Sequence, residues 1–176
     1  MENNIIFLGD SLTEWGNWKE LFPGKKIMNF GIAGDTTGGL LRRLNSVCRH
    51  KASKIFLMIG INDLGDNKDV REILSNYERV IQKMKKECPG TEVHLISVLP
   101  ALYNKFPGSA INHDKVLALN KGIQKIASQY QLNYINLASS FSDKNGSLDR
   151  RYTIDGLHLS KEGYEKWKKG INKYIN

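Results

Sequence analysis

The chain of 176 residues has only two cysteines, four histidines and no long hydrophobic run. Cys48 and Cys88 are too few for a disulfide framework and form no C-x-x-C pair, so we expect both to be small buried hydrophobic residues. A membrane span needs about 20 consecutive apolar residues, and no stretch comes near that length. The first residues lack a basic region followed by an apolar stretch. A cytoplasmic location is therefore expected, while a leader removed beforehand stays open.

Motifs of several common protein classes are also absent. There is no Gly-x-Ser-x-Gly elbow, which disfavours the common α/β-hydrolase arrangement. There is no glycine-rich phosphate loop followed by Lys-Ser or Lys-Thr, and no G-x-G-x-x-G after the first predicted strand. The net charge of +8 is compatible with an anionic partner, but the basic residues are scattered and no nucleic-acid-binding signature accompanies them. We expect neither a nucleic acid nor a membrane as partner.

Short apolar runs alternate with longer amphipathic segments along the whole chain. Hydrophobic residues make up 40% of the sequence and charged residues 25%, as in ordinary globular proteins, and the length suits one domain over residues 1–176. Strands that alternate with helices predict a three-layer α/β/α sandwich with a five-stranded parallel sheet in the flavodoxin-like order 2-1-3-4-5. The expected strands are 5–8, 26–30, 54–59, 92–98 and 133–137, and the expected helices are 15–21, 37–50, 69–88, 113–130 and one capped by Ser160.

Residues that could take part in catalysis follow four of these strands. Ser11 follows the first strand, Gly34 the second and Asn62 the third. Asp155 and His158 end the loop after the fifth strand. Because the carboxyl ends of parallel strands share one edge of a sheet, we expect these five residues to converge there.

This set of residues suits ester hydrolysis. A serine hydroxyl is a weak nucleophile until a histidine removes its proton, and the histidine needs a carboxylate to orient it. Ser11, His158 and Asp155 fit these three roles. The tetrahedral oxyanion needs hydrogen-bond donors, which the backbone N–H groups of Ser11 and Gly34 and the side-chain amide of Asn62 would supply.

Each of these residues also has a simpler explanation. Gly-Asp-Ser before the first helix is typical of a turn, and Asn62 and Gly34 also suit turns. A lone histidine such as His158 is more often packed at a helix start than catalytic. Asp155 and His158 are only two of the ligands that a metal needs and no second cluster supplies the rest, so neither metal nor cofactor is expected. The conjunction of all these residues favours catalysis.

Four sequence blocks together resemble the SGNH hydrolases, also called GDSL esterases. The resemblance covers nearly the whole chain and implies a metal-free serine hydrolase of flavodoxin-like fold. It implies that Ser11 is the nucleophile and that Asp155 and His158 complete its triad. It also implies that Gly34 and Asn62 belong to the oxyanion hole. The blocks are Gly9-Asp10-Ser11-Leu12, Asn29-Phe30-Gly31-Ile32-Ala33-Gly34-Asp35, Gly60-Ile61-Asn62-Asp63 and Asp155-Gly156-Leu157-His158.

Within this family, the segment 152–164 is most similar to the branch of platelet-activating-factor acetylhydrolase and the bacterial carbohydrate O-acetylesterases. The resemblance implies a small-molecule substrate, an ester of a short acyl group such as acetate, with a carbohydrate such as a sialic acid as the alcohol. A lysophospholipase or thioesterase for longer acyl chains, and a non-catalytic binding module on the same fold, stay as alternatives. The sequence leaves the oligomeric state open.

Four further residues are candidates for contact with substrate. Tyr103 and Phe106 lie in a long loop, 99–112, and long loops are often functional, although plain surface packing is an equal alternative. Asp10 and Asp63 are the other two candidates.

Two tryptophans, Trp15 and Trp18, follow the serine closely. They suit either a wall of the acyl pocket or packing of the first helix against the sheet. We favour packing for both, because large aromatic side chains supply much of the buried surface of a core.

Overall fold

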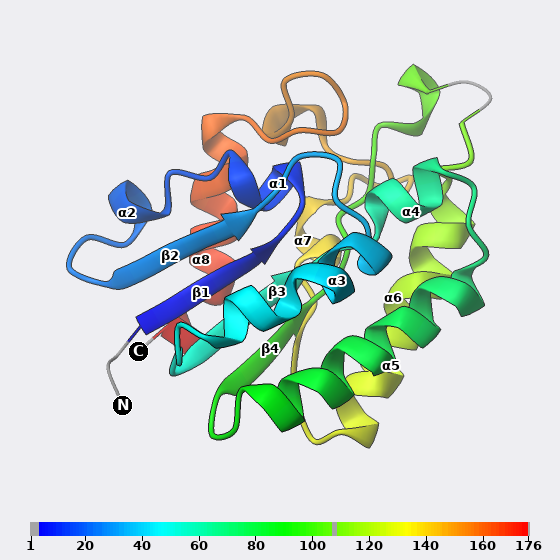
Figure 1. Ribbon diagram of the computed structural model, residues 1–176. Coiled ribbons are helices and arrows are strands. Elements are labelled where there is room, and N and C mark those ends of the chain that lie inside the picture. Colours follow the sequence, from blue (N-terminus) through cyan, green and yellow to red (C-terminus); the bar gives the residue numbers. More distant parts are fainter. Residues whose placement is uncertain (1–3, 107–108, 176) are drawn as a thin grey trace.

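Five parallel strands form one sheet in the computed structural model, which describes residues 4–106 and 109–175. The strand order β2-β1-β3-β4-β5 and the parallel pairing of all neighbours confirm the predicted flavodoxin-like topology (Figure 1). The carboxyl ends of the strands therefore share one edge, as a common site requires. The strands are β1 (Asn4–Gly9), β2 (Lys26–Gly31), β3 (Lys54–Met58), β4 (Glu92–Ile96) and β5 (Asn133–Ile135).

Helices cover both faces of the sheet, as predicted. Helices α3, α5 and α6 pack side by side on one face, and α2 and α8 lie together on the other (Figure 1). Within the described residues, none of the helices has both the length and the apolar character needed to cross a bilayer. The helices are α1 (Ser11–Glu14), α2 (Trp18–Leu21), α3 (Thr37–Cys48), α4 (Ile61–Gly65), α5 (Val70–Glu87), α6 (His113–Gln129), α7 (Ala138–Phe141) and α8 (Lys161–Ile175), with 3-10 turns η1 (Tyr103–Lys105) and η2 (Arg150–Tyr152).

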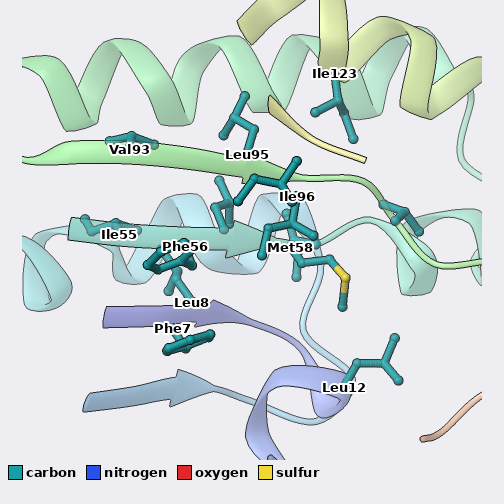
Figure 2. Packing of buried hydrophobic residues seen from close by; sticks show 14 of the residues in the cluster. Phe7, Leu8, Leu12, Ile55, Phe56, Met58, Val93, Leu95, Ile96 and Ile123 are labelled. Atoms are coloured by element: carbon teal, nitrogen blue, oxygen red, sulfur yellow. The ribbon is translucent and has the colours of Figure 1, made fainter. Parts of the chain in front are cut away.

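The hydrophobic core surrounds the central strands β1 and β3. Phe7 of β1 stacks on Trp18 of α2, with 4.1 Å between the ring centroids, and on Phe56 of β3, with 5.2 Å. Figure 2 shows Phe7 and Phe56 together with other members of the core, including Leu95 and Ile96 of β4. Strands buried on both faces explain the continuous apolar runs of the sequence and leave polar chemistry to the strand ends.

The segment 15–21, predicted as one helix, contains a break. The chain ends α1 before Gly16 and begins α2 after Asn17, and each helix has four residues. A side chain at Gly16 would collide with the Trp18 ring, and the Asn17 side chain caps α2 by accepting a hydrogen bond from Glu20 N–H at 3.4 Å. Conversely, α4 and α7 lie in segments predicted as loops, because such short helices show no periodicity.

The expectation for the two cysteines is wrong. Cys48 at the end of α3 and Cys88 directly after α5 form a disulfide, with their Cα atoms 5.1 Å apart. The sequence did not reveal the pair, because the two residues are 40 positions apart and meet only through the packing of α3 against α5. Disulfides are rare in reducing compartments. The bridge therefore weighs against the cytoplasmic location, which stays a prediction.

Candidate active site

The site begins where β1 passes directly into α1. Asp10 is the N-cap of this helix and accepts a hydrogen bond from Leu12 N–H at 3.0 Å, which makes Ser11 the first helical residue. Ser11 thus lies at the carboxyl end of a central strand, with 6% of its surface exposed. An N–H group in the first turn of a helix has no partner within that helix, so the Ser11 N–H is available to an outside acceptor.

Three side chains from two distant segments form a continuous hydrogen-bonded chain. Ser11 Oγ lies 3.1 Å from His158 Nε2. On the other side of the imidazole, His158 Nδ1 lies 2.6 Å from Asp155 Oδ2. The second oxygen of Asp155 accepts hydrogen bonds from the backbone N–H groups of Leu157 at 2.9 Å and His158 at 2.7 Å. One carboxylate therefore holds both the imidazole ring and the backbone that carries it.

The surroundings of Asp155 favour its charged form. Partial burial raises the pKa of this carboxyl group, but hydrogen bonds from the His158 ring and from two backbone N–H groups outweigh it, so the pKa of Asp155 is lowered from its ordinary value. An ionised Asp155 holds Nδ1 of the imidazole as the protonated nitrogen and leaves Nε2 to accept a proton.

Within residues 4–106 and 109–175, no group of three His, Cys, Asp or Glu side chains could hold a metal ion.

The turn that carries Asp155 and His158 is fixed by further hydrogen bonds. Thr153 Oγ1 donates to the His158 carbonyl at 2.7 Å and accepts from Gly156 N–H at 2.8 Å. Gly156 has a φ of +102°, a conformation that favours glycine. Its carbonyl accepts a hydrogen bond from Leu102 N–H at 2.7 Å, so the loop after β4 supports the turn.

The segment after β2 and the short helix α4 bring the remaining candidates to the same edge. Gly34 has a φ of +74°, and Asn62 in α4 donates from Nδ2 to the carbonyl of Asp35, the next residue after that glycine, at 2.9 Å. Arg43 ties this segment to β1, because its Nε donates to Asp35 Oδ2 at 2.8 Å and its Nη2 to the Gly9 carbonyl at 3.1 Å. The structure therefore holds Asn62 against the segment that carries Gly34, and Arg43 ties that segment to the strand that leads into the serine.

Asp63 supports the segments that carry Gly34 and Asn62 through buried hydrogen bonds. Its side chain is 0% exposed and accepts hydrogen bonds from Thr37 N–H and Thr37 Oγ1, both at 2.8 Å, and from Lys68 Nζ at 2.9 Å. Such burial contradicts the prediction that Asp63 contacts substrate. The carboxylate instead joins the start of α3 to α4, the two segments beside Gly34 and Asn62.

Asp10 is likewise too buried to contact substrate, contrary to the prediction. The residue is 1% exposed. Burial raises its pKa to about 7, the hydrogen bond from Leu12 N–H opposes that rise, and the negative charges of Asp35 and Asp63 add to it. Asp10 therefore acts on the backbone at the start of α1, where it serves as the cap.

The loop after β4 carries the two aromatic candidates, Tyr103 and Phe106. Tyr103 in η1 is half-buried, and its ring meets His113 of α6 edge-on with 6.2 Å between centroids. It lines a cavity of about 290 Å³ whose lining, among the described residues, includes neither the serine nor the histidine of the hydrogen-bonded chain. Phe106 is also half-buried, and the loop continues through residues 107–108, which lie outside the described part. Contact of Tyr103 and Phe106 with substrate stays a prediction.

The two tryptophans have different places. Trp18 is 2% exposed and packs in the core against Phe7 and Trp167, which confirms the expected packing. The same expectation is wrong for Trp15, which is 49% exposed and stacks on the His158 ring. No local pattern in the sequence signals this contact, because it depends on the fold bringing residue 158 next to α1.

Comparison with known proteins identifies the family. The model of the GDSL-like lipase/acylhydrolase family matches residues 7–166. The chain belongs to this family. The family is one of lipases and acylhydrolases, and solved structures similar to this chain include a lipase/acylhydrolase, so this GDSL-type chain is an ester hydrolase, as predicted.

Individual relatives of this GDSL hydrolase support the same conclusion. It is 26% identical over 180 residues to platelet-activating factor acetylhydrolase IB subunit alpha2 of Rattus norvegicus, with 99% of this chain and 76% of the relative covered. A solved structure from Streptococcus pneumonia, described as a candidate platelet activating factor, aligns with a TM-score of 0.90 and 37% identity over 100% of this chain and 85% of that one. A lipase/acylhydrolase from Enterococcus faecalis aligns with a TM-score of 0.84 and 25% identity over 98% and 95%.

Proposed function

We propose that Ser11, His158 and Asp155 form the catalytic triad of this ester hydrolase. The hydrogen-bonded chain that joins Ser11 Oγ, the two nitrogens of His158 and Asp155 Oδ2 carries the proposal. His158 Nε2 takes the hydroxyl proton while Ser11 Oγ attacks the ester carbonyl carbon, and the ionised Asp155 stabilises the imidazolium that results. Nε2 then gives this proton to the departing alcohol oxygen, which leaves an acyl group on the serine.

The second half of the cycle uses the same groups with water as nucleophile. His158 removes a proton from the water, the hydroxide oxygen bonds to the acyl carbon, and the proton returns to Ser11 Oγ as the free acid departs. In both halves the carbonyl oxygen becomes an oxyanion. We assign its stabilisation to the N–H groups of Ser11 and Gly34 and to Nδ2 of Asn62, of which one donor alone is worth about 10²–10³ in rate.

The proposed substrate is a small ester with a short acyl group, acetate in the simplest case. The likeness to proteins named acetylhydrolases supports this choice. The proposed alcohol is a carbohydrate such as a sialic acid, on the strength of the segment 152–164 and its resemblance to carbohydrate O-acetylesterases.

Exposed apolar residues favour a second candidate, an ester with a longer acyl chain. Ile32 is 46% exposed and lies two residues before Gly34, and Ile154 is 64% exposed and lies directly before Asp155. Apolar side chains on both segments of the site would suit contact with a hydrocarbon chain.

A series of p-nitrophenyl esters tests these assignments. We expect the wild type to release p-nitrophenol fastest from the acetate and more slowly from the butyrate and octanoate, whereas a preference for octanoate would favour the second candidate. Ser11→Ala should lower kcat by about 10⁴–10⁶, since the nucleophile is gone. Equal release by both proteins would contradict the triad and favour a binding module. Acetylated sialic acid and a lysophospholipid then separate the two classes of alcohol.

A further inference from the structure

Trp15 combines high exposure with a close contact to the proposed catalytic base. The residue is 49% exposed, whereas Trp18 and Trp167 are 2% and 1% exposed. Burial in the core therefore does not account for the position of this indole. Instead, it lies against the imidazole of His158, with 3.9 Å between ring centroids and an angle of 25° between ring planes.

The backbone that carries Trp15 is held from outside α1. A helix of four residues is too short to be stable alone. Side chains from α8, α2 and β2 bind three successive carbonyl groups of this helix and fix the residue that follows it. These hydrogen bonds run from Tyr164 Oη to the Leu12 carbonyl at 2.9 Å, from Trp18 Nε1 to the Thr13 carbonyl at 2.8 Å and from Asn29 Nδ2 to the Glu14 carbonyl at 2.8 Å.

The imidazole of His158 thus has supports of two kinds. Ser11 and Asp155 bind its two nitrogens, at the edges of the ring. Hydrogen bonds at these two atoms allow the ring to tilt about the line that joins them. The indole of Trp15 covers one face of the imidazole and opposes this tilt. The face of an indole also attracts a cation, so it favours the imidazolium that forms during acyl transfer.

We propose that Trp15 is a positioning residue, which holds the imidazole of His158 by one face and stabilises its protonated form. The inference rests on the proposed triad. It implies that Trp15 matters most where the imidazolium has to deliver its proton. A departing alkoxide such as ethoxide needs that proton, whereas p-nitrophenolate leaves without it.

The test compares Trp15→Leu and Trp15→Phe with the wild type on ethyl acetate and p-nitrophenyl acetate. The ethyl group is too small to rest on the indole, so direct substrate contact contributes little. We expect Trp15→Leu to lower kcat for ethyl acetate about tenfold with KM nearly unchanged, since a partly desolvated cation–π contact is worth about that factor. The loss should be smaller for p-nitrophenyl acetate, and Trp15→Phe should recover most of the activity.

Two controls and a normalisation accompany the test. Leu117→Ala removes a side chain of similar exposure (43%) from α6 and should leave kcat unchanged. Ser11→Ala reports whether hydrolysis depends on the triad at all. Active sites are counted with a fluorophosphonate that labels the serine, so a misfolded fraction of any variant does not enter kcat.

Several results would overturn the inference. An unchanged kcat in Trp15→Leu would do so, as would a raised KM alone, which would make Trp15 a substrate contact. Equal losses in Trp15→Leu and Trp15→Phe would also do so, because phenylalanine keeps an aromatic face. If Ser11→Ala is as active as the wild type, the triad itself fails and the inference fails with it, which differs from a failure confined to Trp15.

Discussion

The two edges of the sheet are held together by different means. At the carboxyl edge, buried carboxylates such as Asp63 bind backbone and side-chain donors from neighbouring segments. At the amino edge, where α3 and α5 end, the Cys48–Cys88 disulfide joins the two helices beside a cavity of about 580 Å³ lined in part by Ala52 and Pro89. Hydrogen bonds have preferred directions and so fix how groups point, whereas a disulfide mainly restricts the unfolded chain. The hydrogen bonds at the carboxyl edge therefore orient the side chains of the site, whereas the disulfide at the amino edge stabilises the fold.

Asp155→Asn at the carboxyl edge should have the largest effect. An amide carries no charge to stabilise the imidazolium and favours the wrong tautomer of His158, so we expect kcat for p-nitrophenyl acetate to fall by about 10³–10⁴. The thermal midpoint should change much less than kcat, because the asparagine side-chain oxygen can still accept the hydrogen bonds from the N–H groups of Leu157 and His158. Asp114→Asn, an exposed carboxylate of α6, is the matched control. Activity near the wild-type level would remove Asp155 from the triad.

Asn62→Ala should have the next largest effect. Loss of one oxyanion donor lowers kcat by about 10²–10³, with a smaller change in KM, because the donor acts mainly in the transition state. Asn45→Ala makes the same chemical change at an exposed position of α3, near the amino edge, and should leave kcat intact. Equal kinetics of the two variants would exclude Asn62 from the oxyanion hole.

Asp10→Asn tests the cost of a buried carboxyl group at the carboxyl edge. The folded-state pKa of about 7 lies above the ordinary 3.8, so the folded protein holds this proton more tightly than the unfolded chain does. Asp10 therefore costs stability progressively as the pH rises from about 4 to about 7, up to a ceiling of roughly 4 kcal/mol. Asparagine still offers an oxygen to cap α1 but never ionises.

Urea unfolding at about pH 4 and about pH 8 measures this difference. The free energy of unfolding of Asp10→Asn should exceed that of the wild type at the higher pH by more than at the lower pH. A difference that stays constant with pH would show that the Asp10 carboxyl group does not change its proton affinity on folding.

Removing the disulfide should affect the amino edge alone. Cys48→Ser with Cys88→Ser should lower the free energy of unfolding by about 2–4 kcal/mol, because the bridge closes a long loop in the unfolded chain. At room temperature the double variant should hydrolyse p-nitrophenyl acetate as fast as the wild type. A fall in kcat without a loss of stability would mean that the two edges are coupled.

The features that could be predicted from the sequence are those that depend on the local order of apolar and polar residues. The continuous apolar runs of β1 and β3 and the one-sided pattern of α5 reflect burial, so the strand order and the main helices followed from them. Ser11, Gly34 and Asn62 were predicted because each stands just after a strand, and Asp155 and His158 because they end the loop after the fifth strand. The parallel topology brings all of these segments to one edge of the sheet.

The features that escaped prediction depend on contacts between distant residues. Asp10 and Asp63 stand beside the predicted site, yet whether a carboxylate faces substrate or core is decided by packing that the sequence does not display. Cys48 meets Cys88, and Trp15 meets His158, only after the layers assemble.

Because α1 has only four residues, the proposed nucleophile Ser11 depends for its position on side chains from outside this helix. No bond within the helix suffices to hold it, and its carbonyl groups depend on Tyr164, Trp18 and Asn29. A molecule in which the sheet survives but α8 has undocked would lose the Tyr164 bond and the Trp18 contacts with α8. Enzyme activity should therefore be lost at a lower denaturant concentration than the far-UV circular dichroism signal of the sheet. The loss of activity would then report the undocking of α8.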